Sequence, residues 1–299
     1  MFRHLPKFCV AVLLFASLAA TAQGTPSAAS EPQPPPDAKE IVSQALRLDE
    51  RNFELARNYT CEQRTALKVL DRRGATKRDE TNTYEITILY QEPYGRRILH
   101  NDKPLSGKDE KKEQDKLDKF VAAHKNETEK DREKRLAKQE RARRESRAFV
   151  ADILNAYDFR LLGEESVDGR ATYVVEANPR KDFRPTQPHA DILSKLRGTM
   201  WIDKEDYHWA RVEAESLETI SWGLFLLRIH KGSQLSFRQV RVNNEIWLPQ
   251  RIQVNASSRF ALLFSSAFQW ETTFSSYKKF RAETQILPGV QEPEPQQPQ

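Results

Sequence analysis

Apolar and polar residues alternate along much of the second half of the chain, as they do in antiparallel strands that bury one face. Residues 199–217 alternate on both sides of the polar stretch 203–206, which predicts two strands joined by a tight turn. In residues 260–274 the large apolar side chains stand at even positions. Because successive strand residues point to opposite faces, this run has one apolar and one polar face. The pattern predicts a curved antiparallel sheet with a single apolar face.

Turn signals predict further strands around this stretch. Asp168-Gly169 separates two alternating runs, and Asp-Gly favours a type I′ hairpin turn because that turn needs positive φ at both central residues. Asn243-Asn244 separates another such pair. The remaining strands are predicted over residues 59–69, 84–90, 96–100, 157–167, 171–177, 234–242 and 246–254, with residues 71–77 connecting the first two.

Residues 221–229 are apolar at odd and even positions alike. Two explanations are open: a strand buried on both faces, or a strand with one side against something that this chain does not encode. Both explanations predict one continuous strand in this region.

A helix is predicted over residues 38–57, ahead of the first strand. Asp37 and Glu40 have the spacing of a capping box. Apolar residues then recur at near-helical spacing, and this stripe needs a surface that buries it. The stripe consists of Ile41, Ala45, Leu48 and Leu55, with Val42 and Leu46 beside them. A second, short helix is predicted over residues 189–196.

Residues 106–147 differ sharply in composition, because Lys, Arg, Glu and Asp dominate them. Two capping-box patterns, at Ser106 and Thr128, predict two exposed helices with a break near residues 124–128. A short helix over residues 149–156 continues from them. The segment is interpreted either as a solvated helical insertion or as an arm that touches a partner protein or an anionic headgroup layer.

The N-terminus has the pattern of a signal peptide over residues 1–22, with a basic start, an apolar run and a cleavage site after Ala22. The apolar run is too short for a membrane span of about 20 residues. A Pro-rich tether over residues 23–37 and a tail over residues 288–299 are predicted to be disordered. The expected product is periplasmic or secreted, with one domain over residues 38–287.

Charge and cysteine content limit the classes of partner. Cleavage removes two positive charges and no negative charge, which lowers the formal net charge from +5 to +3. This near-neutral balance is weak evidence for nucleic acid, and no nucleic-acid partner is expected. Cys61 is the one cysteine of the mature chain, so no intramolecular disulfide can form, and it is interpreted as a small buried hydrophobe rather than a reactive thiol.

Enzyme motifs are missing from the sequence. The chain has no HExxH zinc pattern, no GxSxG nucleophile elbow and no GxxxxGK[ST] phosphate loop. The mature histidines show no i,i+4 ligand pair; they are His100, His124, His189, His208 and His230. We therefore predict a protein without enzymatic activity, catalytic residues, metal or cofactor.

Several short motifs, together with the order of elements, resemble the LolA-like group of periplasmic lipoprotein-sorting carriers, lipoprotein acceptors and RseB-type sensors. The motifs are Leu162-Gly163-Glu164, Asp168-Gly169-Arg170, residues 173–176 with Asn178-Pro179, residues 198–203 and Trp247-Leu248-Pro249. The resemblance covers residues 38–280. It implies an α+β, mainly antiparallel fold: a strongly curved half-barrel sheet wrapped over the N-terminal helix, with a charged helical insertion and an apolar concavity that shelters acyl chains.

The aromatic stripe is the candidate hydrophobic ligand site, with simple core packing as the alternative. Each buried acyl CH₂ contributes about 0.8 kcal/mol, so a dozen carbons can be held by apolar walls alone. The candidate residues are Trp222, Phe225, Leu227, Phe260, Leu262, Phe264, Phe268 and Trp270.

Three functions follow from these features. The first is a periplasmic carrier or binder of lipid or acylated protein that uses the apolar concave face, with acyl chains or lipoproteins as partners. The second is an envelope sensor or adaptor whose helical segment 106–147 binds a partner protein. The third is a structural periplasmic protein whose sheet is filled by its own helices. Peripheral membrane contact is compatible with all three.

Overall fold

The computed structural model describes residues 36–71, 73–90, 92–187, 189–222, 227–260 and 264–279. The predicted signal peptide and C-terminal tail lie outside these residues, and so does the predicted tether up to residue 35.

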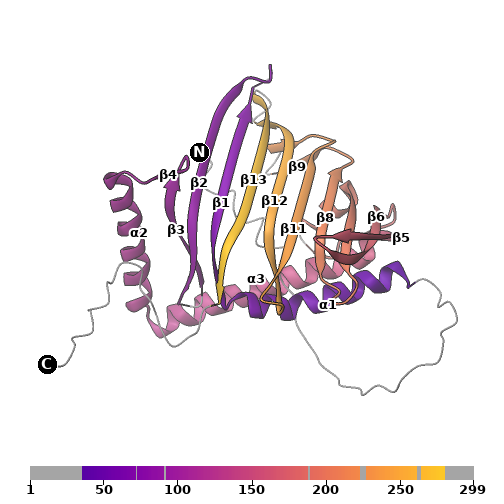
Figure 1. Ribbon diagram of the computed structural model, residues 1–299, viewed down its shortest axis with the longest axis horizontal. Helices are drawn as coiled ribbons and strands as arrows, with labels where there is room; N and C mark the ends of the chain where they lie inside the picture. Colours follow the sequence, from indigo (N-terminus) through magenta and orange to yellow (C-terminus); the bar gives the residue numbers. More distant parts are fainter. Residues whose placement is uncertain are drawn as a thin grey trace.

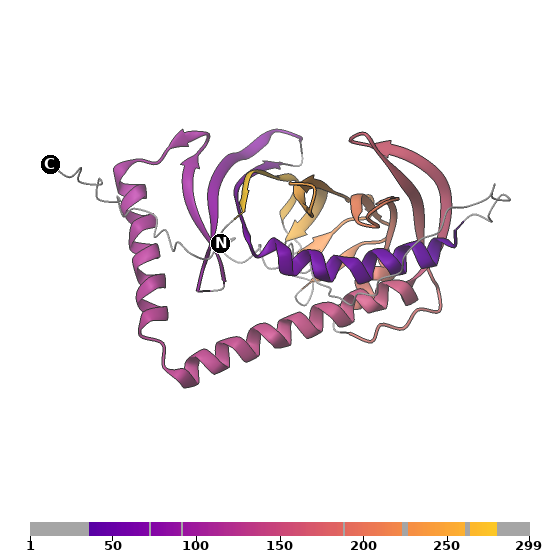
Figure 2. The same ribbon diagram turned by 60° about the horizontal axis from the view of Figure 1, so that its bottom comes forward.

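The described strands join one antiparallel sheet, whose main path runs β4-β3-β2-β1-β13-β12-β11-β8-β7-β6-β5 (Figure 1). The two ends of this path, β4 and β5, are not paired with each other, and Figure 2 shows that the sheet is strongly curved. The predicted α+β, mainly antiparallel architecture is confirmed. Its strands are β1 (Tyr59–Leu70), β2 (Thr76–Leu89), β3 (Glu92–His100), β4 (Lys103–Pro104), β5 (Tyr157–Val167), β6 (Arg170–Pro179), β7 (Leu196–Asp203), β8 (Trp209–Ser216), β9 (Ile220–Trp222), β10 (Leu227–Ile229), β11 (Gln234–Val242), β12 (Ile246–Phe260) and β13 (Phe264–Lys279).

The first and last strands of the chain lie side by side. β1 pairs with β13 from Tyr59 opposite Lys279 to Leu70 opposite Ala267. This pairing joins the N-terminal strands β1–β4 to the later meander. Contacts between chain ends are invisible to local periodicity, so the sequence predicted both groups of strands but not their junction.

Residues 220–222 and 227–229 form two strands rather than the predicted one. β9 pairs antiparallel with β10, with Trp222 opposite Leu227, and β10 continues the sheet beside the end of β12. The prediction of a single strand is wrong because an apolar run carries no periodic signal that marks a reversal of the chain.

Helix α1 (Ala38–Ala56) packs its apolar stripe into the main core. The side chain of Asp37 caps it by accepting a hydrogen bond from the Lys39 N–H. Four stripe residues are buried in the core with strands β5 to β8: Ile41, Val42, Ala45 and Leu46. The second half of the predicted stripe differs, because Leu48 is half-buried and Leu55 is 38% exposed. Asp49 and Asn52 are buried instead, and Asn52 exchanges two hydrogen bonds with the backbone of Trp247.

The charged segment forms α2 (Gly107–Lys125) and α3 (Glu129–Ala156), with the break where the capping boxes predict it. Two details differ from the prediction. Glu113 and Leu117 of α2 are buried at 3% exposure, so this helix is not exposed on all sides. The predicted helix over residues 149–156 is the end of α3, not a separate element.

Topology explains why the charged helices are long. The chain leaves the sheet at the β4 edge and re-enters it at β5, the opposite edge. A helix rises about 1.5 Å per residue, so the 28 residues of α3 cover roughly 40 Å. Figure 2 shows α3 running from the end of α2 past α1 to the β5 side. Arg135 holds α3 to the sheet by an ion pair with Glu92 of β3 (3.1 Å), and it also pairs with Glu127 in the turn before α3 (2.8 Å).

The sheet has one apolar and one polar face, as predicted. The helix face carries Val175, Met200 and Val212, which pack in the core that α1 helps to form. On the polar face, charged side chains of neighbouring strands pair with each other, as Arg251 does with Glu271 and Arg197 with Glu215.

A short helical turn, η2 (Ala190–Lys195), lies near the predicted position 189–196. It buries Ala190 and Leu193 in the same core.

Candidate hydrophobic ligand site

The eight predicted site residues fall into two groups. Phe268 and Trp270 lie on the helix face of β13, and both are half-buried. Four others stand at the ends of paired strands: Trp222 opposite Leu227, Leu227 opposite Phe260, and Phe260 opposite Phe264. Phe225 and Leu262 lie outside the described residues. The aromatic stripe is therefore divided between the body of the sheet and one end of it.

Phe268 and Trp270 have apolar neighbours on adjacent strands. Val69 of β1 stands opposite Phe268, and Trp270 lies between Leu67 of β1 and Val254 of β12. Leu235 of β11 stands opposite Val254 and is 36% exposed. Directly opposed residues share a face, so the set spans four adjacent strands of the helix face. We call it the apolar patch; it consists of Leu67, Val69, Leu235, Val254, Phe268 and Trp270.

Sequence reasoning missed four of the six residues of this patch. Leu67, Val69, Val254 and Leu235 belong to ordinary alternating runs, so nothing distinguishes them from core residues of other strands. The parity of each strand places them on an apolar face. Only the β1–β13 pairing places Leu67 and Val69 beside the aromatic stripe.

The apolar patch differs from the main core in its cover. α1 contacts β5, β7 and β12, and the core beneath it takes in the end of α3. Of the patch residues with a described exposure, none is buried to the level of the core. The described helices thus close one part of the helix face and leave the patch half-buried.

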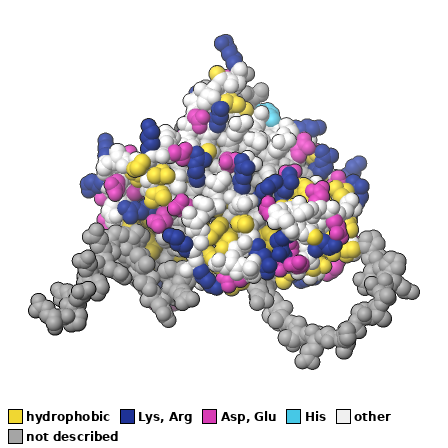
Figure 3. Space-filling view, viewed as in Figure 1, with side chains coloured by type: hydrophobic (Ala, Val, Ile, Leu, Met, Phe, Trp, Pro, Cys, Tyr) yellow, Lys and Arg dark blue, Asp and Glu magenta, His cyan; other side chains and the backbone are white. Residues whose placement is uncertain are grey.

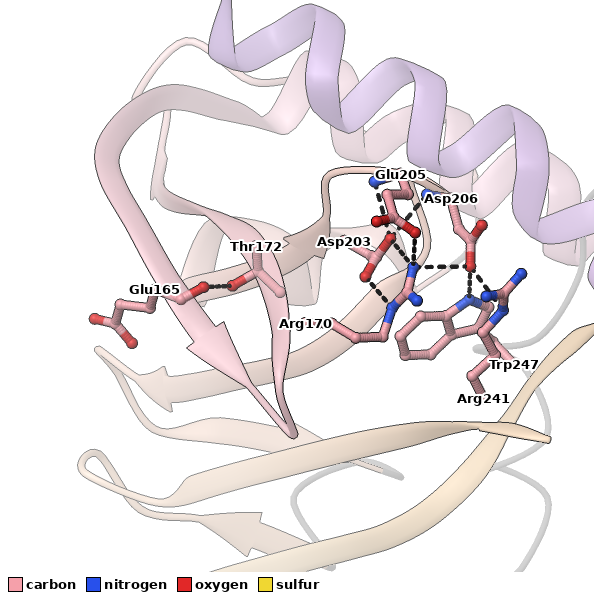
Figure 4. A network of polar contacts seen from close by, with 8 residues as sticks. All are labelled: Glu165, Arg170, Thr172, Asp203, Glu205, Asp206, Arg241 and Trp247. Atoms are coloured by element: carbon pink, nitrogen blue, oxygen red, sulfur yellow. Dashed lines mark hydrogen bonds and ion pairs between the residues drawn. The ribbon is translucent and has the colours of Figure 1, made fainter. Parts of the chain in front are cut away.

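Three of the motifs that carry the sequence resemblance meet in one polar network, through Arg170, Asp203 and Trp247 (Figure 4). Arg170 donates to both carboxylate oxygens of Asp203, at 2.6 and 2.8 Å, and to Glu205 at 3.0 Å. Trp247 donates its indole N–H to Asp206 at 2.9 Å, and the Arg170 guanidinium lies 5.6 Å from the centre of the Trp247 ring. The network joins three hairpin ends, so these motifs have a structural role.

Asp203 is buried at 1% exposure, so its charge depends on these partners. Burial works to raise the pKa of the Asp203 carboxyl. Hydrogen bonds from Arg170 and from the backbone N–H groups of Asp206 and Glu205 outweigh burial and hold that pKa below its usual value. The same hydrogen bonding raises the pKa of Arg170. The pair is charged throughout the physiological range.

Two further buried groups titrate abnormally near α1 and the network. Burial raises the pKa of Asp49, on the buried side of α1, to about 7. Burial lowers the pKa of His208, which precedes β8, to about 4, so this imidazole is neutral at neutral pH. Neither Oδ1 of Asp49 nor Nδ1 of His208 has a hydrogen-bond partner among the described residues.

Cys61 is half-buried on β1, and burial raises the pKa of its thiol to about 11. The protonated thiol is a poor nucleophile, in keeping with the prediction that Cys61 acts as a small hydrophobe.

Within the described ranges, no group of three or more His, Cys, Asp and Glu side chains is placed to hold a metal ion. In that same part of the chain, no helix combines the length and apolar character needed to cross a membrane.

Comparison with known proteins finds similarity to solved structures only. No family model matches the chain, and no curated protein matches it. A DUF1329 family protein from Desulfovibrio piger is 14% identical, with 81% of this chain and 92% of that one covered at a TM-score of 0.30. A LolA superfamily protein from Nitrosomonas europaea is 13% identical, with 82% and 93% covered at 0.27. MucA/MucB from Pseudomonas aeruginosa gives 10% identity, with 83% and 100% covered at 0.25.

These structures include members of the group that the sequence motifs resemble. The TM-scores are low, so the proposals below rest on the geometry of this chain. The chain is similar to LolA-like proteins, and its own structure is an open, curved antiparallel sheet with α1 on its apolar face.

Proposed function

We propose that the protein is a non-enzymatic binder or carrier of lipid or acylated protein, and that the acyl chain lies on the apolar patch. The single observation that supports this most is a continuous apolar row across four strands, with Phe268 beside it: Leu67, Trp270 and Val254 are half-buried, and Leu235 is exposed. Apolar surface of this kind gains free energy when a ligand covers it.

The size of the gain fits an acyl ligand. Burying one CH₂ group contributes about 0.8 kcal/mol, so a dozen carbons contribute roughly 10 kcal/mol when fully covered. A free energy of about −8 kcal/mol corresponds to a dissociation constant near 1 μM. Specificity for a headgroup is not required for binding of this strength, and the patch residues supply none.

The hairpin-end residues extend the proposed site. Phe260, Phe264 and Leu227 follow the patch along β12, β13 and β10 toward one end of the sheet. Together with Trp222, and with Phe225 and Leu262 outside the described residues, they make up the rest of the proposed ligand-binding set.

The first experiment is native mass spectrometry, combined with lipid extraction, on protein purified without detergent from its own compartment. A stoichiometric co-purified acyl species is the expected result. A ligand-free mass, with no uptake of palmitate when it is offered, would contradict the proposal. The same sample gives the mature N-terminus and so tests the predicted signal peptide and cleavage after Ala22.

A matched pair of variants on β13 then tests the patch itself. Phe268→Asp places a charge on the apolar patch, and Gln269→Asp places one on the polar face, one residue along the same strand. Palmitate uptake is expected to fall at least tenfold in the first variant and to be unchanged in the second. Thermal unfolding must stay cooperative in both, which separates a loss of binding from a loss of the fold.

Contact between the helical segment 106–147 and an envelope protein stays a prediction. The segment has a topological role that needs no partner, because α2 and α3 connect the two edges of the sheet. The outer side of α3 nevertheless carries a row of exposed basic residues at near one-turn spacing: Lys130, Lys134, Lys138 and Arg141. Two of them pair within the helix, Lys134 with Asp131 and Arg141 with Glu145. Loss of a co-purifying protein in the variant Lys130→Glu with Lys138→Glu would support that contact.

A further inference from the structure

A second surface suited to a ligand lies on the polar face, on the other side of the sheet from the apolar patch. A hollow of about 440 Å³ crosses strands β6, β7, β8, β11 and β12. A shallower one of about 290 Å³ continues it toward β13 and shares Gln234 and Asn255 with it. The second hollow is also lined by Lys231 and by Phe268 of the apolar patch. We therefore call the first hollow alone the polar groove.

Two rows of side chains form the walls of the polar groove. One row runs Glu176, Thr199, Glu213, Ser236 and Gln253, each residue opposite the next on neighbouring strands. The other runs Arg197, Glu215, Gln234 and Asn255.

The floor of the polar groove is backbone. Gly198, Ala214 and Leu235 lie between the two rows, and the side chains of Ala214 and Leu235 point to the helix face. Strands lie about 4.8 Å apart, and the rows are two residues or roughly 7 Å apart along each strand. The groove therefore presents pairs of polar groups at a regular step across the strands, which suits a chain of repeating units.

The charges in the polar groove already have partners. Arg197 pairs with Glu215 at 3.2 Å, Glu176 pairs with Arg160 at 2.8 Å, and Glu213 pairs with Arg211. A ligand here meets no free charge of either sign. An anion or a cation would have to break one of these pairs, so the groove favours an uncharged ligand.

The uncharged groups in the polar groove have unused hydrogen-bonding capacity. The side chains of Thr199, Gln234, Ser236 and Asn255 make no side-chain hydrogen bond to any residue in the described part of the chain. Hydroxyl and amide groups both donate and accept, as sugar hydroxyls do. Figure 3 looks onto this face, and its middle is mostly uncharged, with Lys, Arg, Asp and Glu scattered around it.

We infer that the polar groove binds a neutral, linear oligosaccharide that lies across the strands, with its hydroxyl groups between the two rows. An extended peptide fits less well, because the backbone groups of the floor are already paired within the sheet and cannot pair with a further strand. The groove uses the face opposite the apolar patch, so this inference does not depend on acyl binding.

The test is an NMR titration of the full chain with two neutral probes, maltotetraose and N-acetylchitotetraose. We expect one of them to bind with a dissociation constant on the order of 1 mM, since a site without an aromatic platform relies on hydrogen bonds alone. Shifts are expected at backbone amides of β11 and β12. Failure of both probes to bind at concentrations well above that constant would overturn the inference.

Two double variants separate a built site from general sugar contact. Ser236→Ala with Asn255→Ala removes one group from each row and is expected to weaken binding about tenfold. Thr273→Ala with Ser275→Ala makes the same kind of change on the polar face of β13, outside the groove, and is expected to leave binding unchanged. Equal affinity in the two variants would refute the assignment. Palmitate uptake is expected to stay normal in both double variants. Phe268→Asp is expected to leave tetrasaccharide binding intact. The two proposals can therefore be refuted independently of each other.

Discussion

The helix face of the sheet is packed in two different ways along its width. Over β5 to β8 it is closed by α1 and the end of α3, and Val175 and Ile202 have no exposed surface. Over β1, β12 and β13 it carries equally apolar residues, yet Val69, Phe268 and Trp270 are half-buried. The alternation of the sequence is the same in both regions. The difference teaches that an apolar strand face gives a core or a binding surface according to what covers it.

The closed region also holds the polar network, and breaking it is expected to have the largest effect. Arg170→Ala leaves the buried Asp203 carboxylate without its partner, which should cost about 3–5 kcal/mol of unfolding free energy. Arg251→Ala removes an exposed ion pair on the polar face and should cost less than about 1 kcal/mol. Urea unfolding of both variants measures the difference. Equal losses would mean that the network contributes no more than a surface pair.

Asp49 gives a pH-dependent test of the cover that α1 provides. Its pKa is about 7 in the folded chain and 3.8 without burial, so the folded state binds more protons between these values. Stability that depends on protonated Asp49 is therefore fully present below about pH 4 and is lost as pH rises through 7. Asp49→Asn removes this loss and should stabilise the protein by up to about 4 kcal/mol at pH 8, and much less at pH 5.

Urea unfolding at the two pH values measures this effect, with the exposed Asp158→Asn variant as the control. A gain from Asp49→Asn that is the same at pH 5 and pH 8 would show that Asp49 is ionised in the folded protein. The cover by α1 would then be looser than the burial of Asp49 indicates.

The third test compares one residue type in the two regions. Val175→Ala removes two methyl groups from the closed core and should cost about 2 kcal/mol, because it also leaves a cavity. Val69→Ala makes the same change in the apolar patch and should cost about 1 kcal/mol or less, since solvent or ligand can fill the space. Adding palmitate should raise the unfolding temperature of the natural chain more than that of the Val69 variant. An equal cost for both changes would indicate that the patch is packed as core.

Much of the architecture was predictable because it depends on local chemistry. Capping residues at Asp37, Ser106 and Thr128 mark the starts of three helices, and all three accept the hydrogen bond that their residue type predicts. The Asp168-Gly169 and Asn243-Asn244 turns adopt the positive φ values that hairpins need. Parity along each strand gave the apolar and polar faces.

The candidate site was predictable only in part. The even-position pattern correctly placed Phe268 and Trp270 on the apolar face. It also grouped them with residues that the structure places at the strand ends, such as Phe260 and Phe264. The polar groove gave no signal, because its residues are ordinary polar members of alternating strands. Their significance depends on cross-strand neighbours that lie far apart in sequence, as Thr199 and Ser236 do through Glu213.

By itself, the sequence determined the elements, their faces and the positions of the turns, because caps, turn residues and period-two alternation act over a few residues. The tertiary structure alone decided that β1 pairs with β13 and that α3 connects opposite edges of the sheet. It also decided that α1 buries Asp49 and leaves Leu55, which was expected to be buried, exposed. Those outcomes depend on which apolar surfaces meet and how far apart they lie. Such contacts join residues separated by up to the length of the domain, so no local pattern encodes them.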